Sequence, residues 1–406
     1  MLLMKWFIDL FRVWRRELWL SVTDLGVLIF FVALPLGYPI IYTLIYNPET
    51  IREIPMVIVD HSRTAESRDL VRTLSATPAI KIAGYASDMG EAKRAWAEKK
   101  CYSIIEIPSD YARKIGGGQQ AVISYYQDMS LLFRYRQNLF SLTQVQMAET
   151  AKVTAQRVAD EAGGVSTLIT GLPVATQSSI AGDPTQGFAS FIMPGVVILI
   201  LQQGMLMGIT MLAGTRRDRR RRNPLGIDST DIGAGPLATV LGRAAAYLTI
   251  YLPMTYFVVA LIPAIFSLPQ AGHFMDYFPF IFVMLLATAF LGQTLQIFVR
   301  ERETSMVLIV FTSVFFLFLS GLTWPRYAFP WFWKAVSDLI PATWGVEGYI
   351  HIHSNGASLA EVYPQFWPLW GLTILYLITA LIIRAYTYPR KKLRQSETLA
   401  GAEVAR

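Results

Sequence analysis

Few residue groups in this 406-residue chain have the types and spacing of a catalytic or metal site. Asp60 and His61 would suit acid–base chemistry, but adjacent residues on a strand point to opposite faces and do not form a pair. His351 and His353 could share a metal on an extended segment, but no third ligand accompanies them. The glycines at 116–118 lack the lysine and hydroxyl residue that follow in a P-loop. The sequence therefore predicts no catalytic residue, no metal and no cofactor in this chain.

The most unusual charged group is a block of six arginines within residues 216–222, directly after the uncharged stretch 191–213. An arginine at the middle of a bilayer costs roughly 2.5–3.5 kcal/mol on insertion scales, so the block must stay outside the membrane and end a span. A basic run can also bind nucleic acid, but this one has no interleaved aromatic residues and is tethered between apolar segments. We expect it to meet lipid headgroups and no nucleic acid.

Four glutamines lie within strongly apolar stretches. Gln202 and Gln203 are adjacent in one stretch, and Gln293 and Gln296 lie three residues apart in another, which places the second pair on one helix face. An amide at membrane depth is costly unless it faces protein or water. The glutamines therefore either line a translocation path or form hydrogen bonds between helices, and the sequence leaves both readings open.

The elements that position these residues are membrane helices. The chain is 53% hydrophobic and 16% charged, with a mean hydropathy of +0.39, whereas soluble proteins are about 25% charged. A bilayer core of about 30 Å requires about 20 apolar residues as helix. Six segments meet this requirement: 25–46, 189–213, 242–266, 277–299, 304–322 and 364–385.

The distribution of lysine and arginine predicts the orientation of these spans. Residues 1–24 form an amphipathic helix expected to lie on the membrane surface, 214–241 form a basic loop, and 386–406 form a basic tail. With both termini in the cytoplasm, the cytoplasmic segments, counted as 1–24, 214–243, 300–303 and 384–406, carry 19 lysines and arginines. The short outer loops 267–276 and 323–363 carry two. The positive-inside rule therefore places both termini in the cytoplasm and residues 47–188 outside it.

Residues 47–188 have the pattern of a separate folded domain. Apolar strand-like runs at 54–60, 80–85, 102–108 and 121–128 alternate with helical segments, and a long helix is expected over 130–162. The predicted fold class is therefore a polytopic α-helical membrane protein with six transmembrane helices and a mixed α/β extracytoplasmic domain.

Residues 323–350 are rich in tryptophan and proline and suit short helices that re-enter the outer leaflet. Glu347 would lie near membrane level in this segment. It is a candidate for the translocation path, although a hydrogen bond to a helix end is an equal alternative.

Several stretches together resemble the membrane subunit of ABC-2 type transporters. They are "WFIDLFRVWRRELW" (6–19), "IPMVIVDHSRTAESRDLVRTL" (54–74), "SIIEIPSDYARKIGGG" (103–118) and "LSGLTWPRYAFPWFWKAVSDLIPATWGVEGYI" (319–350). The resemblance covers nearly the whole chain and rests on the order and spacing of these stretches. It implies six helices that form half of a dimeric pore, made with a second copy or a paralogous permease. It also implies a separate ABC ATPase subunit that uses the ATP.

The resemblance further implies where the ATPase would bind. Members commonly carry an acidic Glu-x-Glu-x-Gly-Thr element after the second span, and here Gly214 and Thr215 are kept while arginines replace the acidic residues. The implied coupling residues are Arg12, Arg15, Arg16, Gly214, Thr215, Arg216, Arg217, Asp218 and Arg219.

The expected function is export of a small amphiphilic, drug-like or lipidic compound across the cell (inner) membrane. A periplasmic adaptor is a further possible partner. Two alternatives are a membrane-anchored envelope adaptor and a polytopic membrane enzyme that acts through residues 47–188.

Overall fold

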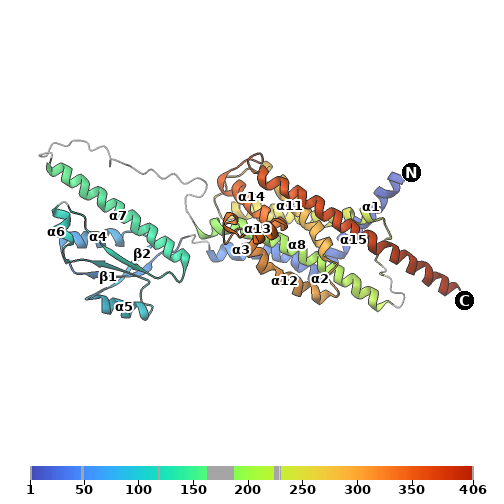
Figure 1. The fold of residues 1–406 in the computed structure, drawn as a ribbon, viewed down its shortest axis with the longest axis horizontal. Coiled ribbons are helices and arrows are strands. Elements are labelled where there is room, and N and C mark those ends of the chain that lie inside the picture. Colours follow the sequence, from blue (N-terminus) through green and yellow to red (C-terminus); the bar gives the residue numbers. More distant parts are fainter. Residues whose placement is uncertain are drawn as a thin grey trace. The chain divides into compact units, whose positions relative to one another are not determined.

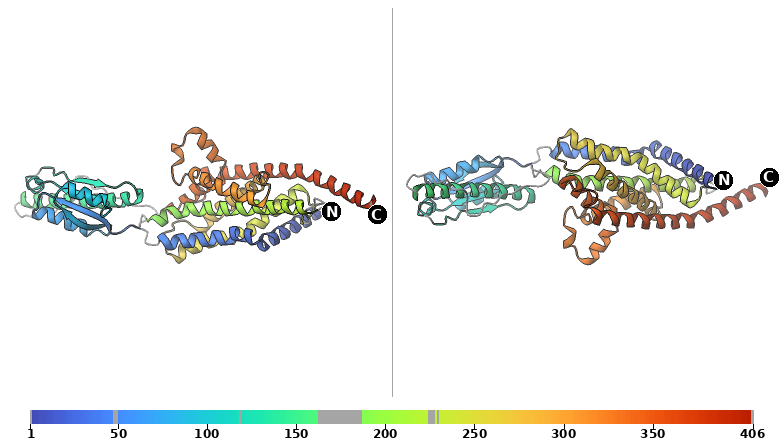
Figure 2. Two further views of the ribbon diagram at one scale, coloured as in Figure 1. Left: turned by 90° about the horizontal axis from the view of Figure 1, so that it is seen from below. Right: turned by 90° about the horizontal axis from the view of Figure 1, so that it is seen from above.

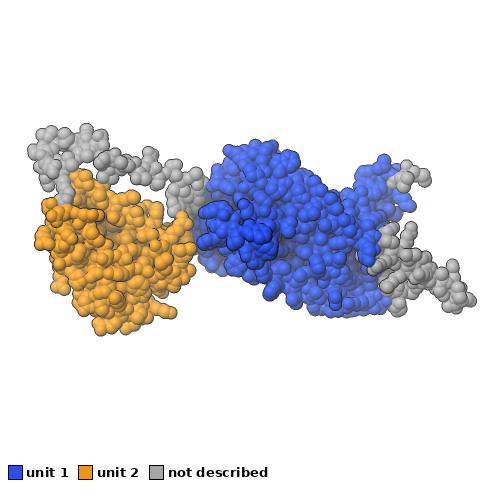
Figure 3. All heavy atoms as spheres, viewed as in Figure 1, with its two compact units in different colours: residues 1–47, 180–406 blue, residues 48–179 orange. Residues whose placement is uncertain are grey.

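The computed structural model describes residues 2–46, 50–117, 119–161, 187–223, 228 and 230–404. The chain divides into two compact units, one formed by Met1–Asn47 with Ile180–Arg406 and the other by Pro48–Ser179 (Figure 3). We call these unit 1 and unit 2, and each is described by itself.

Unit 2 is built on a four-stranded mixed sheet with strand order β2-β1-β3-β4. The strands are β1 (Ile54–Asp60), β2 (Ile80–Ala86), β3 (Ser103–Ile107) and β4 (Ser124–Gln127). Strand β1 pairs in parallel with β2 and β3, and β4 pairs antiparallel with β3. Apolar runs this short and continuous suit strands covered on both faces, which is what the buried pattern of β1 shows.

Helices cover both faces of this sheet (Figure 1). They are α4 (Ala65–Ser75), α5 (Met89–Ala97), α6 (Tyr111–Gly116) and α7 (Leu132–Glu161). Alternate residues of β1 point to opposite faces, so Met56 and Ile58 pack in a core with α4 and α7, whereas Val57 and Val59 pack in a core with α5. Residue Thr64 begins α4 with a capping box.

Unit 1 is helical throughout its described part. Its elements are α1 (Leu2–Thr23), α2 (Leu25–Leu28), η1 (Ile29–Ala33), α3 (Leu34–Tyr46), α8 (Phe188–Arg222), α9 (Pro236–Tyr256), η2 (Phe257–Leu261), α10 (Ile262–Ile265), α11 (Phe274–Leu295), α12 (Arg302–Leu319), η3 (Arg326–Ala328), α13 (Trp331–Asp338), α14 (Pro341–Asn355) and α15 (Tyr363–Val404). Within the described ranges, six helical segments are long and apolar enough to cross a membrane: Leu25–Tyr46, Phe188–Arg222, Pro236–Ile265, Phe274–Leu295, Arg302–Leu319 and Tyr363–Tyr386. The fold is that of a polytopic helical membrane protein with a small mixed sheet.

Helix α8 is the central element of unit 1 and is buried along most of its apolar length. Gly204 and Gly208 let the first span approach it closely: a Cβ at Gly208 would lie 1.9 Å from the Phe31 ring, and one at Gly204 would lie 2.6 Å from the Phe30 carbonyl oxygen. Glycines four residues apart lie on one helix face and are a common contact surface between membrane helices.

Two predicted segment boundaries are wrong. The basic loop expected over 214–241 is helical at both ends, because α8 continues to Arg222 and α9 begins at Pro236. The tail expected over 386–406 continues α15 as far as Val404. Arginine is a good helix former, and positive charge near a helix C-terminus interacts favourably with the helix dipole, so charge ends the membrane span without ending the helix.

Candidate functional site

One carboxylate, Glu17 of α1, lies buried among side chains from two other helices. It accepts hydrogen bonds from Arg216 of α8 and from the Tyr247 hydroxyl of α9, and Arg243 Nε lies 3.6 Å from its Oε2. The side chain of Glu17 is 4% exposed and that of Arg216 is 9% exposed. Buried charges are tolerated when they are paired and hydrogen-bonded, so this carboxylate fixes α1 to α8 and α9.

A second ion pair joins the start of the first span to the start of α12. Both guanidinium nitrogens of Arg302 bind Asp24, at 2.6 Å and 2.9 Å. Asp24 also caps α2 by accepting from the backbone N–H of Gly26 at 3.1 Å. The backbone N–H of Arg302 donates to Asp218 Oδ2 at 3.3 Å, and a Cβ at Gly214 would lie 2.7 Å from the Arg302 Cα. The end of α8 is therefore in close backbone contact with α12.

A third group reaches the last span. Arg384 of α15 lies 3.2 Å from Asp231, and Arg220 of α8 lies 3.8 Å from the same carboxylate. Arg221 pairs with Glu301 just before α12. We call these three groups together the basic-end network.

The basic-end network ties α1, α8, α9, α12 and α15 to one another. Helix α1 and the last part of α15 lie at the end of unit 1 where α8 ends (Figures 1 and 2). Glu17 joins α1 directly to α8 and α9, whereas α12 is joined through Asp24, which follows α1, and α15 through Asp231, which also meets Arg220 of α8.

The residues expected to contact an ATPase separate into an exposed and an internal set. Arg12, Arg15, Arg16 and Arg219 are exposed. Gly214 and Arg216 are buried. The Thr215 hydroxyl donates to the Met211 carbonyl at 3.0 Å, and Arg217 donates to the Gln296 carbonyl at 3.0 Å. Asp218 accepts a hydrogen bond from the backbone N–H of Arg302. In this internal set, Thr215, Arg217 and Asp218 are half-buried, and Arg216, Arg217 and Asp218 contact other helices or segments of this chain.

The four glutamines do not form one polar path. Gln202 Oε1 accepts from the backbone N–H of Ala342 at 2.7 Å, which satisfies the N-terminus of α14. Gln293 Nε2 donates to the Val240 carbonyl at 3.2 Å and joins α11 to α9. Both contacts correspond to hydrogen bonding between helices, one of the two readings that the sequence left open.

The other two glutamines differ from these. The prediction that Gln296 shares a face with Gln293 inside a span is wrong, because α11 ends at Leu295 and Gln296 is its C-terminal cap beside the arginine block. Among the described residues, neither polar atom of the half-buried Gln203 side chain has a hydrogen-bond partner. Gln202 Nε2 and Gln293 Oε1 also lack a partner among the described residues, so Gln203 differs in that both of its amide atoms are unsatisfied.

Glu347 is engaged in an ion pair. The guanidinium of Arg326 binds both Glu347 of α14 and Asp338 of α13, and it stacks over the Trp344 ring with Cζ 4.0 Å from the ring centroid. The Arg326 side chain is 10% exposed. This contact holds the segment between α12 and α14 together.

The remaining candidates from the sequence, Asp60, His351 and His353, do not form a catalytic or metal site among the described residues. Asp60 accepts from the backbone N–H of Ser62 and from the Ser67 hydroxyl, at 2.9 Å and 2.7 Å, so it orders the turn between β1 and α4. His351 and His353 lie on helix α14, where residues two apart point in different directions, and not on a strand. Within the described residues, no three histidine, cysteine or acidic side chains gather as a metal site.

Sequence analysis missed the partners that complete the network. The signal for Glu17 was available, because it lies four residues after Val13 and three before Leu20, both of which are buried on the same face of α1. Asp24 stands directly before the first span, where an N-cap is expected. For Arg302 and Arg384, only the three-dimensional contacts show which carboxylate each one binds.

Comparison with known proteins agrees with this architecture. A family model described as ABC-2 family transporter protein matches residues 25–382. A search of curated proteins finds no match. The matched range includes five of the six candidate spans in full, most of the sixth, and unit 2, and it amounts to well over half of the chain. Of the basic-end network, Glu17, Asp24 and Arg384 lie just outside it. This multi-pass membrane protein therefore belongs to the ABC-2 family of transporter proteins and is a permease of an ABC transporter.

Proposed function

We propose that this chain is the membrane subunit of an exporter that moves a small amphiphilic, drug-like or lipidic compound out of the cell. A separate ABC ATPase would bind at the basic end of unit 1 and supply the energy. The observation that supports this most directly is the basic-end network, because it links the surface helix α1 mechanically to four spans. A partner that moves α1 would move those spans with it.

The proposed ATPase surface consists of the exposed cations at this end. They include Arg12, Arg15, Arg16, Arg219 and Arg222; Lys5, Arg300 and the Glu301-paired Arg221 are exposed as well. The sequence resemblance implied a wider set, and the proposed surface leaves out Gly214 and Arg216, which are buried. Exposed arginines attract an acidic partner surface and increase its association rate, and both effects fall as salt rises.

The test of partner binding uses the full chain in nanodiscs and an ABC ATPase that co-purifies with it in mild detergent. We expect the two proteins to form a complex whose affinity falls at least about tenfold when Arg12, Arg15 and Arg16 are all changed to glutamate, because attractive charges become repulsive. A matched control is Arg94→Glu, an exposed arginine of unit 2. We expect ATP hydrolysis from the complex and none from the permease alone. Hydrolysis by the permease alone, or equal loss in the control, would contradict the proposal.

The proposed orientation places both termini in the cytoplasm and unit 2 outside it, because the basic end of unit 1 carries most of the membrane-flanking cations. Cys101, the single cysteine, is buried, so Cys101→Ala gives a background for labelling. On sealed cells, a membrane-impermeant maleimide should label a cysteine at position 98 and spare one at position 222. The opposite pattern would invert the topology.

Transport itself is tested with inverted membrane vesicles that contain the complex. We expect ATP-dependent uptake of rhodamine 6G, a cationic amphiphile, and no uptake when the ATPase is omitted. Transport of a different amphiphile, such as a fluorescent phospholipid, would assign the lipidic branch of the proposal. Formation of the complex without transport of either class would instead favour the alternative role of an envelope adaptor.

A further inference from the structure

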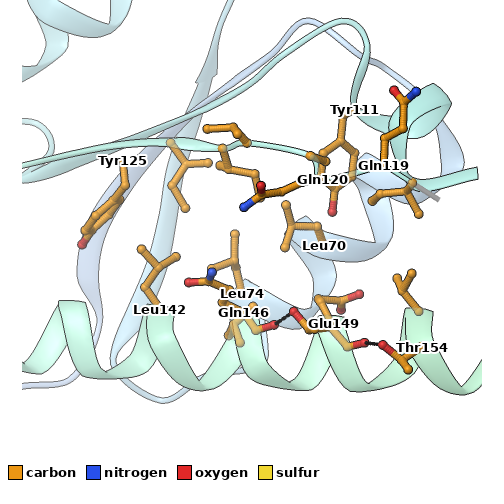
Figure 4. Close-up of a pocket in the computed structure, with 18 residues that line it drawn as sticks. Leu70, Leu74, Tyr111, Gln119, Gln120, Tyr125, Leu142, Gln146, Glu149 and Thr154 are labelled. Carbon is orange, nitrogen blue, oxygen red and sulfur yellow. Dashed lines mark hydrogen bonds between the residues drawn. The ribbon is translucent and has the colours of Figure 1, made fainter. Parts of the chain in front are cut away.

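Unit 2 contains a cavity of about 530 Å³ between helix α7 and the sheet. Helices α4 and α6 and the segment that leads into β4 form its other walls (Figure 4). Small-molecule sites commonly have volumes of about 300–1,000 Å³ and a largely apolar lining with a few polar groups. The cavity has the size of such a site.

The inner wall of this cavity is apolar. Leu70 and Leu74 of α4, Ile105 of β3 and Val145 of α7 line it, and each is at most 3% exposed. These side chains belong to the core on this side of the sheet, so the surface they present is positioned by packing. An apolar group that enters the cavity gains roughly 25 cal/mol for each Å² removed from water.

Two polar groups face this apolar wall from opposite sides. The Tyr111 hydroxyl of α6 points into the cavity, and the Glu149 carboxylate projects toward it from α7 (Figure 4). None of the described residues forms a hydrogen bond with the Tyr111 hydroxyl, although the residue is 5% exposed. Thr73 donates to Glu149 Oε1 at 2.5 Å, and no described cation lies within 4.0 Å of this carboxylate.

The charges around the cavity favour a cation. Burial raises the pKa of Tyr111 to about 12, and the nearby Glu149, Asp69 and Glu66 act in the same direction. Tyr111 therefore stays protonated at neutral pH and can donate a hydrogen bond. Lys152 is paired with Asp69, and Glu149 also helps to raise the pKa of Lys152 from a longer distance. No ion pair within 4.0 Å engages Glu149 among the described residues. No lysine or arginine lines the cavity, so an anion would find no countercharge there.

We propose that the cavity between α7 and the sheet binds a cationic amphiphile. The apolar body of the ligand packs against the wall formed by Leu70, Leu74, Ile105 and Val145, and its positive group lies against Glu149. The Tyr111 hydroxyl donates a hydrogen bond to a polar atom of the ligand. This inference goes beyond the proposed function, because binding here requires neither ATP nor movement across the membrane. It assigns to unit 2 a ligand site of its own.

The experiment uses the full chain in nanodiscs of zwitterionic phosphatidylcholine. Fluorescence polarisation measures binding of rhodamine 6G, which is a cation, and of fluorescein, an anion of similar size. Empty nanodiscs supply the background from partition into lipid. We expect saturable binding of rhodamine 6G above this background and no saturable binding of fluorescein.

Three variants locate the site. Glu149→Gln keeps the acceptor for Thr73 and removes the charge, so it should weaken rhodamine 6G binding roughly tenfold or more, as loss of a hydrogen-bonded charge does. Ala121→Trp places a large side chain in the cavity and should abolish binding. Glu98→Gln is the matched control, because this carboxylate pairs with Lys100 and ends α5 on the other face of the sheet.

The outcomes separate the site from its alternatives. Binding that is unchanged in both Glu149→Gln and Ala121→Trp would overturn the proposal, since the ligand would then bind elsewhere on the chain. Equal saturable affinity for fluorescein would refute the role of charge. Equal weakening in Glu98→Gln would show that Glu149 has no specific part. If the site variants lose binding but vesicles still export rhodamine 6G, the binding site stands and is separate from the transport path.

Discussion

Replacing Glu17 with glutamine tests how the surface helix α1 is held to the spans. The substitution keeps the size of the side chain and removes its negative charge. Arg216 and Arg243 then lie buried close to each other without the carboxylate that now pairs with both. Because like charges repel more strongly where water is excluded, the folded state loses more than one hydrogen bond.

The magnitude follows from the burial of the group. The side chains of Glu17, Arg216 and Arg243 are 4%, 9% and 12% exposed. Removing one partner of a buried ion pair costs about 3–5 kcal/mol, because the other charge stays buried. On the scale of soluble domains of similar size, this corresponds to a fall of roughly 6–20 °C in the midpoint of thermal unfolding.

The order of the variants is a sharper expectation than the absolute value. In Arg216→Met, Glu17 retains Arg243 and the Tyr247 hydroxyl as partners. We therefore expect Arg216→Met to be less damaging than Glu17→Gln. The double variant should be less damaging than the sum of the two, since it removes one cation together with the anion.

Tryptophan fluorescence during heating provides the assay. Of the ten tryptophans, only Trp96 lies in unit 2, so the signal reports on unit 1. Asp9→Asn is the matched control, because Asp9 lies on the same helix but pairs only loosely, at 4.0 Å, with the exposed Arg12. It should change the midpoint by less than about 4 °C, as expected for a surface pair worth at most about 1 kcal/mol. A midpoint for Glu17→Gln equal to that of Asp9→Asn would refute the reasoning.

Three further predictions address other contacts. Gln202→Leu leaves the Ala342 N–H without its acceptor and should lower the stability of unit 1 by about 1–3 kcal/mol, measured by the same unfolding assay against Gln203→Leu. Arg326→Ala should lower the local stability of the segment by about 1–2 kcal/mol and make amide hydrogen exchange over η3 and α13 roughly tenfold faster. Unchanged exchange would contradict the role given to this ion pair. In unit 2, Lys152 of α7 donates a hydrogen bond to Asp69 of α4 and lowers the pKa of that carboxyl group. The stability that this contact gives should therefore be complete above the unfolded-state pKa of about 4, and it should be lost as the pH falls through the lower pKa of the folded state. The protection factors of α7, which correct hydrogen exchange for its slower intrinsic rate in acid, should therefore fall on acidification in the wild type. The corresponding step should be missing in Asp69→Asn.

The spans could be predicted from sequence because their signal is local. A run of about 20 apolar residues is sufficient to define a membrane helix, and the six candidate helices coincide closely with the predicted segments. The strands of unit 2 were equally predictable, since short apolar runs separated by capped helices identify them one at a time. The ends of α8 and α15 were not predictable in this way, because hydropathy marks the edge of the membrane and not the end of a helix.

For the candidate sites, too, the sequence identified unusual residues but not their partners. The sequence identified the arginine block and the glutamines as unusual, and the family resemblance suggested a partner-driven permease. It did not show that Arg216 is buried against Glu17, 199 residues earlier in the chain, or that Gln202 caps α14.

Sequence by itself determined the class of molecule, because hydropathy and charge distribution act residue by residue along the chain. Only the tertiary structure decided which charges pair, which arginines remain exposed, and that a cavity with an unpaired carboxylate lies under α7. The physical reason is that the energy of a charge depends on its neighbours and on the exclusion of water, and both are set by segments far apart in the sequence.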